Sequence, residues 1–146
     1  MARARQFGRD DMNGEGRDLF VGVGADREAT ADEARALVFA ALAKAGAPVE
    51  DVACVASIDL KAGKPAVEDL ADDLGVPVRF FSAARLEAET PRLANPSEAV
   101  FMKVGCHGVA EAAALAAAGT SATLVVPKLK GAHVTLAIAR SGRRLT

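Results

Sequence analysis

The fold is decided by residues 19–46, which have the sequence LFVGVGADREATADEARALVFAALAKAG. A short apolar run broken by Gly22 and Gly24 opens the stretch, which is typical of a buried strand that enters a tight turn. Thr30 with Glu33 three positions later forms a capping box, the usual start of a helix. Apolar residues then recur at helical spacing up to the closing glycine. The stretch therefore predicts a strand, a turn and a helix, which together open an α/β fold.

The rest of the chain continues this alternation. We expect further strands at residues 52–58, 76–81, 123–126 and 134–139, and further helices at 65–74, at about 82–88 and around Ser97 and Glu111. The last two strands, joined by Pro127–Ala132, are predicted to form a hairpin. The predicted fold class is α/β: a single three-layer domain, with a mixed, mostly parallel sheet of about five strands, helices on both faces and a C-terminal β-hairpin. Residues 1–17 have little to bury and are expected to be a flexible leader to a domain at 18–146.

Composition argues against several classes of protein. The two cysteines, Cys54 and Cys106, match no metal-ligand spacing, and no apolar run suits a signal peptide or a membrane span. A formal net charge of -1 and the absence of Trp and Tyr argue against a dedicated nucleic-acid binder. We therefore expect a cytoplasmic protein that binds neither nucleic acid nor membrane and that has no metal site and no cofactor.

Charge is distributed unevenly along the chain. No Asp or Glu follows Glu111. The Lys and Arg residues that follow it are Lys128, Lys130, Arg140, Arg143 and Arg144. Such a segment suits an anionic partner. The alternative is a solvated basic edge that keeps a terminal hairpin from aggregating.

Two loops at predicted strand ends could carry a site, because ligands of open α/β sheets lie outside the carboxyl ends of the strands. Gly22 and Gly24 could expose backbone N–H groups to an anion, or could simply allow a tight turn. A further hypothesis, a nucleotide-binding regulatory domain, rests only on these two glycines. Ser57, Asp59 and Lys61 end the second strand, where a carboxylate and an ammonium could orient a polar substrate. A plain polar loop explains them equally well.

Two later motifs have a local explanation. Asn95–Glu98, with the sequence NPSE, starts a helix in which Asn95 or Ser97 would be the cap. Cys106 and His107 suggest a nucleophile and its base, but adjacent side chains usually point apart and no third residue orients them. The residues alone therefore point to a helix start and a turn at these two places.

Several stretches stand in a characteristic order along the chain. They are Val21–Gly24 with Thr30, Ser57–Ala62, Asn95–Val100, Val109–Ala113, Leu124–Lys128 and Val134–Ala139. As an ordered set they resemble one family of cobalamin biosynthesis proteins, CobE and the C-terminal domain of CbiG, over nearly all of residues 20–140. The sequence departs from the family pattern at residues 25–29, at Gly63-Lys64 and at Cys106-His107. The single-domain layout is closer to CobE.

The resemblance implies a role in building the corrin ring of vitamin B12. It implies binding of a corrinoid or precorrin intermediate, with other enzymes of the cobalamin pathway as further partners. The alternative is a hydrolase that opens the ring-A lactone of cobalt-precorrin-5A and releases acetaldehyde, with Asp59 or Glu98 as the base and Lys61 or Lys128 as the cation. The ligand-binding residues expected on this basis are Gly22, Gly24, Thr30, Ser57, Asp59, Lys61, Asn95, Ser97, Glu98, Lys128 and Lys130.

Overall fold

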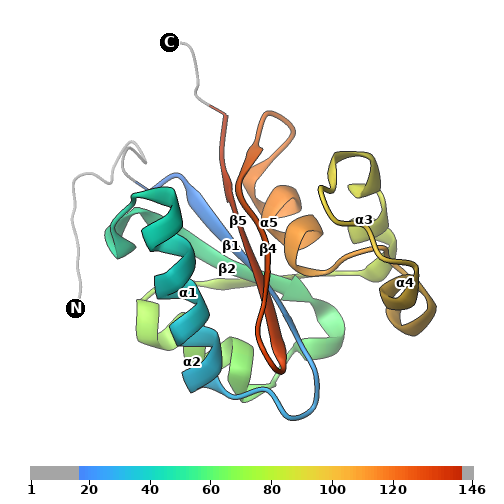
Figure 1. Cartoon of the computed structure of the whole chain (residues 1–146), viewed down its shortest axis with the longest axis horizontal. Helices are drawn as coiled ribbons and strands as arrows, with labels where there is room; N and C mark the ends of the chain where they lie inside the picture. The colour runs from blue at the N-terminus through green and yellow to red at the C-terminus, as the bar shows by residue number, and fades with distance from the viewer. Residues whose placement is uncertain (1–16, 143–146) are drawn as a thin grey trace.

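A five-stranded sheet with helices on both faces is seen in the computed structural model, which describes residues 17–142 (Figure 1). The strands are β1 (Leu19–Ala25), β2 (Val52–Ile58), β3 (Val78–Phe81), β4 (Thr123–Lys130) and β5 (Val134–Arg140). The α-helices are α1 (Ala31–Ala45), α2 (Pro65–Leu74), α3 (Ala83–Glu87), α4 (Glu98–Val104) and α5 (Ala110–Ala118), and the short 3-10 turns are η1 (Val49–Asp51), η2 (Asp59–Lys61) and η3 (Thr90–Arg92). The predicted leader, residues 1–17, lies outside the described residues except for Arg17.

The strand order in the sheet is β3-β2-β1-β5-β4. β1 pairs in parallel with β2, and β2 with β3, whereas β5 runs antiparallel to both of its neighbours, β1 and β4. All strands except β5 therefore point the same way, and β4 and β5 form the C-terminal hairpin. The predictions of an α/β domain, a mixed sheet of five strands and a terminal hairpin are confirmed.

Two strands differ from their predicted bounds. β3 begins at Val78, because the N–H of Val76 still bonds to the carbonyl of Ala71 (3.0 Å) and closes the preceding helix. β4 continues through Pro127 instead of ending at Val126. Proline has no N–H for the ladder, and the strand accommodates it with register shifts on either side of Val126. The hairpin connection is therefore shorter than the predicted loop.

The two faces of the sheet are packed differently. α1 and α2 cover one face with branched aliphatic side chains, and α5 covers the other, with α3 and α4 beside it (Figure 1). Seven of the nine residues of α5 are Ala, so this helix can lie close to the sheet. A Cβ at Gly22 would lie 1.9 Å from the carbonyl oxygen of Ala110. Gly22 is therefore required for the close approach of α5 to β1.

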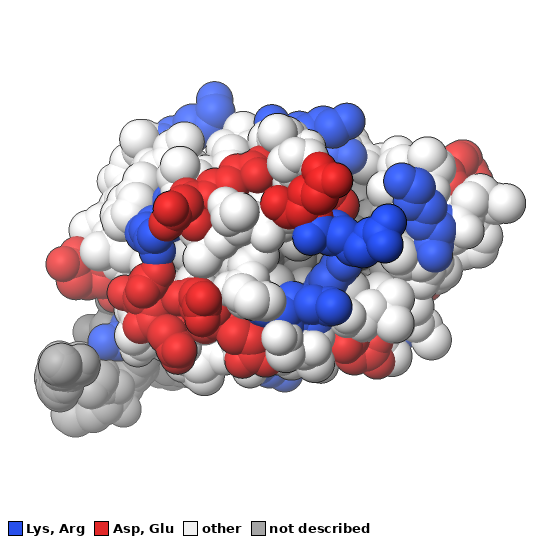
Figure 2. All heavy atoms as spheres, turned by 90° about the horizontal axis from the view of Figure 1, so that it is seen from below, with Lys and Arg blue, Asp and Glu red and all other residues white. Residues whose placement is uncertain are grey.

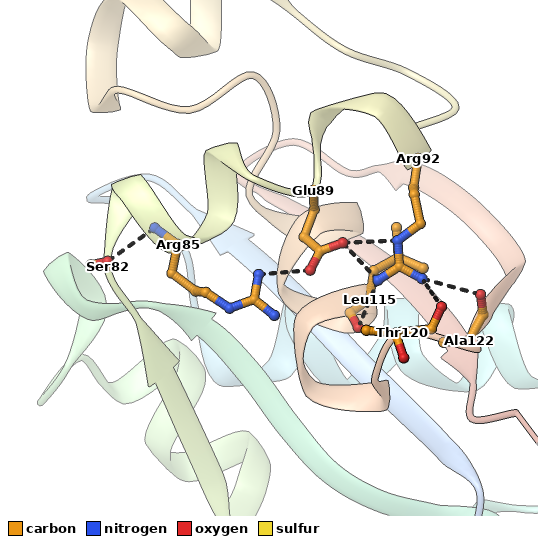
Figure 3. Close-up of polar contacts among 7 residues, drawn as sticks. All are labelled: Ser82, Arg85, Glu89, Arg92, Leu115, Thr120 and Ala122. Carbon is orange, nitrogen blue, oxygen red and sulfur yellow. Dashed lines mark hydrogen bonds and ion pairs between the residues drawn. The ribbon is translucent and has the colours of Figure 1, made fainter.

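A buried polar cluster joins the segment after α3 to the C-terminal end of α5 (Figure 3). Glu89 is 7% exposed, and its carboxylate accepts a hydrogen bond from Arg85 (2.7 Å) and two from Arg92 (2.6 and 2.9 Å). Arg92 also donates to the backbone carbonyls of Leu115, Thr120 and Ala122. Burial raises the pKa of Glu89, but the two guanidinium groups outweigh it and hold the pKa below its ordinary value. The cluster fastens three segments of the chain together.

Three further observations bear on function. Among the helices of residues 17–142, none combines the length and the apolar character that a membrane crossing requires. The same part of the chain contains no group of three or more His, Cys, Asp and Glu side chains placed to bind a metal ion. Cys54 and Cys106 are both free and buried, and burial raises the pKa of Cys54 to about 11. Neither cysteine has the exposure or the lowered pKa of a reactive thiol.

Candidate ligand-binding cleft

An open cleft of about 350 Å³ lies where β1, β2 and β4 end. Its wall is formed by the turn after β1, by η2, by α4, by the first turn of α5 and by the turn between β4 and β5. This is the end of the sheet at which ligands of open α/β folds bind. Figure 2 looks at the molecule from this side and shows basic side chains gathered beside a white, hollowed area, with acidic side chains on the other side of it.

The wall of the cleft combines apolar side chains with four lysines. Its apolar side chains come from the end of β2, from α4, from the start of α5 and from β5: Ile58, Val100, Val104, Val109 and Val134. Its four lysines come from η2, from the last turn of α4 and from β4: Lys61, Lys103, Lys128 and Lys130. Within residues 17–142, none of these lysines forms an ion pair. The lysines outnumber the two carboxylates of the wall, Asp26 and Glu111, so the cleft carries positive charge.

Glu111 is a buried carboxylate in the wall of this cleft. It is 2% exposed and accepts hydrogen bonds from the backbone N–H groups of Ala94, Asn95 and Lys128 and from the side-chain amide of Asn95, at 2.8–3.0 Å. Burial raises the pKa of Glu111, but these hydrogen bonds outweigh it, so the pKa lies below its ordinary value. Glu111 is therefore ionised at neutral pH and connects α5 to two other parts of the wall.

The acidic side of the cleft is the rim formed by the β1–α1 turn and the hairpin turn. His133 Nδ1 lies 2.9 Å from Asp26 Oδ2, and its Nε2 lies 3.5 Å from Glu28 Oε1. The hydrogen bond with Asp26 raises the pKa of His133 and lowers that of Asp26. Glu33, from the first turn of α1, accepts from the backbone N–H groups of His133 (2.7 Å) and Val134 (3.2 Å). These contacts hold the hairpin turn against the start of α1.

Five of the residues predicted to bind ligand are brought together at the cleft: Gly24, Lys61, Asn95, Lys128 and Lys130. A Cβ at Gly24 would lie 2.5 Å from Thr135 Oγ1, so a side chain at this position would have to displace the Thr135 hydroxyl. Asn95 does not cap α4 as one alternative had it, because its amide donates to Glu111 (2.8 Å). Ser97 caps that helix instead, by accepting from the N–H of Val100 (3.2 Å).

The other predicted residues lie outside the wall of the cleft. Gly22 is covered by α5. Thr30 caps α1, by accepting from the N–H of Glu33 (3.1 Å). Ser57 is fully buried and donates to the carbonyl of Val23 (2.6 Å), so it links β2 to β1. Each of these three residues therefore has a structural role: close helix packing, helix capping or a bond between strands.

The two candidate catalytic bases do not face the cleft either. Asp59 is an exposed residue of η2 and is not part of the wall. Glu98 is an exposed residue of the first turn of α4, and its Oε2 lies 3.2 Å from His107 Nε2. Asp59 shares η2 with Lys61, but within residues 17–142 neither carboxylate forms an ion pair with Lys61 or Lys128.

Cys106 and His107 do not pair with each other. The Cys106 thiol is buried and donates to the carbonyl of Gly108 (3.7 Å), and burial raises its pKa. The His107 ring lies 2.9 Å from Glu87 Oε2 and stacks on Phe101 at 4.5 Å between ring centroids. The hydrogen bond with Glu87 raises the pKa of His107. His107 therefore joins α3 to α4.

Sequence reasoning did not propose several residues of the wall, among them Lys103, Glu111 and Asp26. Lys103 is one of many surface lysines until α4 is placed beside the cleft. Glu111 gave a usable signal, because it is the lone carboxylate of an Ala-rich helix, and a carboxylate that such a helix buries needs hydrogen-bond donors. Asp26 lies in the stretch where the sequence departs from the family pattern.

Comparison with known proteins identifies the family of the chain. The family described as Cobalamin synthesis G C-terminus matches residues 19–139. Protein CobE of Sinorhizobium sp is 50% identical over 124 residues, which cover 85% of this chain and 80% of that protein. The crystal structure of CobE, a protein from the cobalamin (vitamin B12) biosynthetic pathway, matches with a TM-score of 0.78 at 37% identity and covers 84% of this chain and 89% of that one.

A more distant relative represents the hydrolase branch. The cobalt-precorrin-5A hydrolase of Priestia megaterium is 28% identical over 121 residues, which are 83% of this chain but 32% of the hydrolase. The family match and the likeness to CobE agree with the ordered stretches of the sequence. The chain therefore belongs to the Cobalamin synthesis G C-terminus family and is a CobE-like cobalamin biosynthesis protein.

Proposed function

We propose that this chain acts in the cytoplasm by binding a corrinoid or precorrin intermediate in the cleft at the strand ends. The observation that carries the proposal is the set of four lysines, without ion-pair partners among residues 17–142, around an apolar wall. Such intermediates combine an apolar macrocycle with carboxylates at its periphery. Ammonium groups bind carboxylates through charge-assisted hydrogen bonds, and the apolar wall can cover part of the ring.

The size of the cleft limits how the ligand would sit. Small-molecule sites have volumes of roughly 300–1,000 Å³. This cleft, at about 350 Å³, is at the lower end of that range. One edge of the macrocycle with its carboxylates would enter the cleft, while the rest would stay open to water or to another enzyme of the pathway. An open site of this kind suits a protein that passes its ligand on.

The test is an absorbance titration of the full chain with a corrin polycarboxylate, such as hydrogenobyrinic acid, at low and high salt. We expect saturable binding that weakens as salt screens the lysines, and weaker binding by the fully amidated counterpart. Lys61→Ala and Lys128→Ala should each weaken binding, whereas Lys44→Ala, an exposed residue in the last turn of α1, should not. Equal affinity for the acid and its amide would contradict recognition by charge.

A lactone-opening hydrolase is the second candidate, favoured by the 28% identity to a cobalt-precorrin-5A hydrolase. In this mechanism a carboxylate activates water and a cation stabilises the oxyanion. Asp59 and Glu98 both lie outside the cleft wall, so the geometry supports this candidate less well than ligand binding. Incubation of the chain with the lactone substrate tests it: release of acetaldehyde that is lost in Asp59→Asn or Glu98→Gln would support it, and no release above background would remove it.

A further inference from the structure

The Glu111 carboxylate uses all of its hydrogen-bonding capacity within the cleft wall. Its Oε1 accepts from the backbone N–H groups of Ala94 (3.0 Å) and Asn95 (2.9 Å). Its Oε2 accepts from the Asn95 side-chain amide (2.8 Å) and from the backbone N–H of Lys128 (2.9 Å). A carboxylate offers about four lone-pair positions, so four donors saturate it. Glu111 therefore has no capacity left to bind a ligand itself.

The two segments that Glu111 holds lack regular backbone partners at these points. In β4, Val126 pairs with Ile138 and Leu129 with Leu136, so two residues of β4 lie opposite one residue of β5. This is a β-bulge, a device that redirects side chains next to functional sites. Lys128 lies within the bulge, and its N–H turns away from the ladder to Glu111. The backbone of Lys128 is thus held by a contact with α5.

The second segment is the loop between η3 and α4. Ala94 and Asn95 are both exposed, yet their backbone N–H groups converge on the same carboxylate oxygen. The Asn95 side chain is fixed as well, since its amide donates to the other oxygen. Glu111 thus connects a loop and a strand that are about 30 residues apart in sequence, and Asn95 and Lys128 from these two segments both line the cleft.

We propose that Glu111 is the positioning residue of the cleft, which holds Asn95 and Lys128 in place for an anionic ligand. The inference rests on the proposed function, because it concerns the same site. The donors to Glu111 are all neutral N–H groups, so the carboxylate is stabilised without using a lysine. A lysine paired with Glu111 would not be available to a ligand. Because Glu111 pairs with neutral groups instead, the lysines of the cleft remain available.

The first test is Glu111→Gln, with Glu89→Gln as the matched control. Both substitutions replace one oxygen of a buried carboxylate by an NH₂ group of similar size, which faces N–H donors and loses their hydrogen bonds. Glu89 lies in the cluster of Figure 3 and not in the cleft wall. We expect the affinity for the corrin polycarboxylate to fall about tenfold in Glu111→Gln and to stay unchanged in Glu89→Gln, although both variants melt at lower temperature.

The second test asks whether Glu111 acts through the residues that it holds. In a chain that carries Asn95→Ala and Lys128→Ala, Glu111→Gln should change affinity by less than twofold, because the side chains that it positions are already gone. If Glu111→Gln does not fold, Glu111→Asp takes its place, with Glu89→Asp as the control. The aspartate carboxylate is one methylene shorter and cannot reach the loop and the strand together.

The outcomes separate this proposal from the proposed function. Wild-type affinity in Glu111→Gln, or an undiminished tenfold loss in the background without Asn95 and Lys128 side chains, would overturn the positioning role and leave ligand binding standing. Absence of binding by the wild-type chain would overturn the proposed function and the positioning role with it.

Discussion

Two carboxylates are buried within residues 17–142, and they are satisfied in opposite ways. Glu89, 7% exposed, is held by the guanidinium groups of Arg85 and Arg92. Glu111, 2% exposed, is held by four neutral N–H groups. Both carboxylates have a pKa below the ordinary value, although burial alone would raise it.

The difference shows what each region is built for. At Glu89 both guanidinium groups already have the carboxylate as a partner, and Arg92 also donates to backbone carbonyls, so the cluster fastens α3 and α5 together. At Glu111 the neighbouring lysines stay unpaired within residues 17–142, and the bulged strand presents one of them at the cleft. The first region stabilises the fold, and the second is suited to binding.

The largest expected effect on stability is that of Arg92→Ala. It removes two hydrogen bonds from the buried Glu89 carboxylate and uncovers three backbone carbonyls. We expect a loss of about 2–4 kcal/mol, because removing one partner leaves a buried charge poorly compensated. Urea denaturation measures it, with Arg85→Ala as the milder control. A loss below about 1 kcal/mol, as for a surface ion pair, would remove the structural role of the cluster.

Glu111→Gln should cost less stability than Arg92→Ala, in the order of 1–3 kcal/mol, because neutral N–H donors rather than charges are left without a partner. The same denaturation experiment measures it. Its distinguishing feature is the accompanying loss of ligand affinity, which Arg92→Ala should not show. Equal affinity loss in both variants would erase the contrast between the two carboxylates.

Lys128→Ala and Lys103→Ala should leave stability within about 0.5 kcal/mol, because neither ammonium has an ion-pair partner in the described part of the chain. Each should weaken binding of the corrin polycarboxylate and reduce its dependence on salt. Denaturation and titration of the same variants check both halves. Destabilisation without loss of affinity would assign these lysines to the fold.

The smallest expected effect is a pH dependence from the pair of His107 and Glu87. The pair raises the pKa of His107 and lowers that of Glu87. His107 contributes fully to the stability of the fold below its unfolded-state pKa of about 6.5, and this contribution is lost as pH rises through its raised folded-state pKa. Glu87 contributes fully above its unfolded-state pKa of about 4.3, and this contribution is lost as pH falls through its lowered folded-state pKa. His107→Gln should therefore flatten the decline of stability above about pH 6.5.

A second histidine must be removed from that measurement. His133 has its own raised pKa because of Asp26, so it adds a decline of the same sign in the same range. Melting temperatures of His107→Gln in a His133→Gln background isolate the His107 pair. Histidines titrate between roughly pH 6 and pH 8. If melting temperature falls with pH as steeply in the double variant as in His133→Gln over this range, the His107 pair does not stabilise the folded state.

The fold was largely predictable because the sequence signals that determine its helices and strands are local. The capping box at Thr30, the glycine after α1 and the apolar strand runs all act within a few residues, and each was confirmed. The one misplaced boundary of consequence, at Pro127, came from treating proline as a strand end. An edge strand with a β-bulge tolerates a proline. The bulge in β4 arises from its pairing with β5, so residues near Pro127 alone do not reveal it.

The cleft was predictable only in part. Lysines 61, 128 and 130 stood out as basic residues at strand ends, and they line the cleft together. Thr30, Ser57 and Ser97 have the same chemistry as binding residues, but each has a backbone partner. The caps at Thr30 and Ser97 were foreseen from the sequence, whereas the bond from Ser57 to the neighbouring strand is seen only in the structure. Lys103 and the partners of Glu111 depend on contacts between distant elements, which no local pattern contains.

The most direct test of the account is to map where the ligand binds. Amide NMR spectra of the ¹⁵N-labelled full chain, recorded during titration with the corrin polycarboxylate, report on every backbone N–H. We predict that the amides of Lys61, Lys103 and Lys128 shift, and that those of Arg85 and Arg92 do not. Saturable binding whose shifts gather around the Glu89 cluster, with none at the lysines of the cleft, would contradict the account.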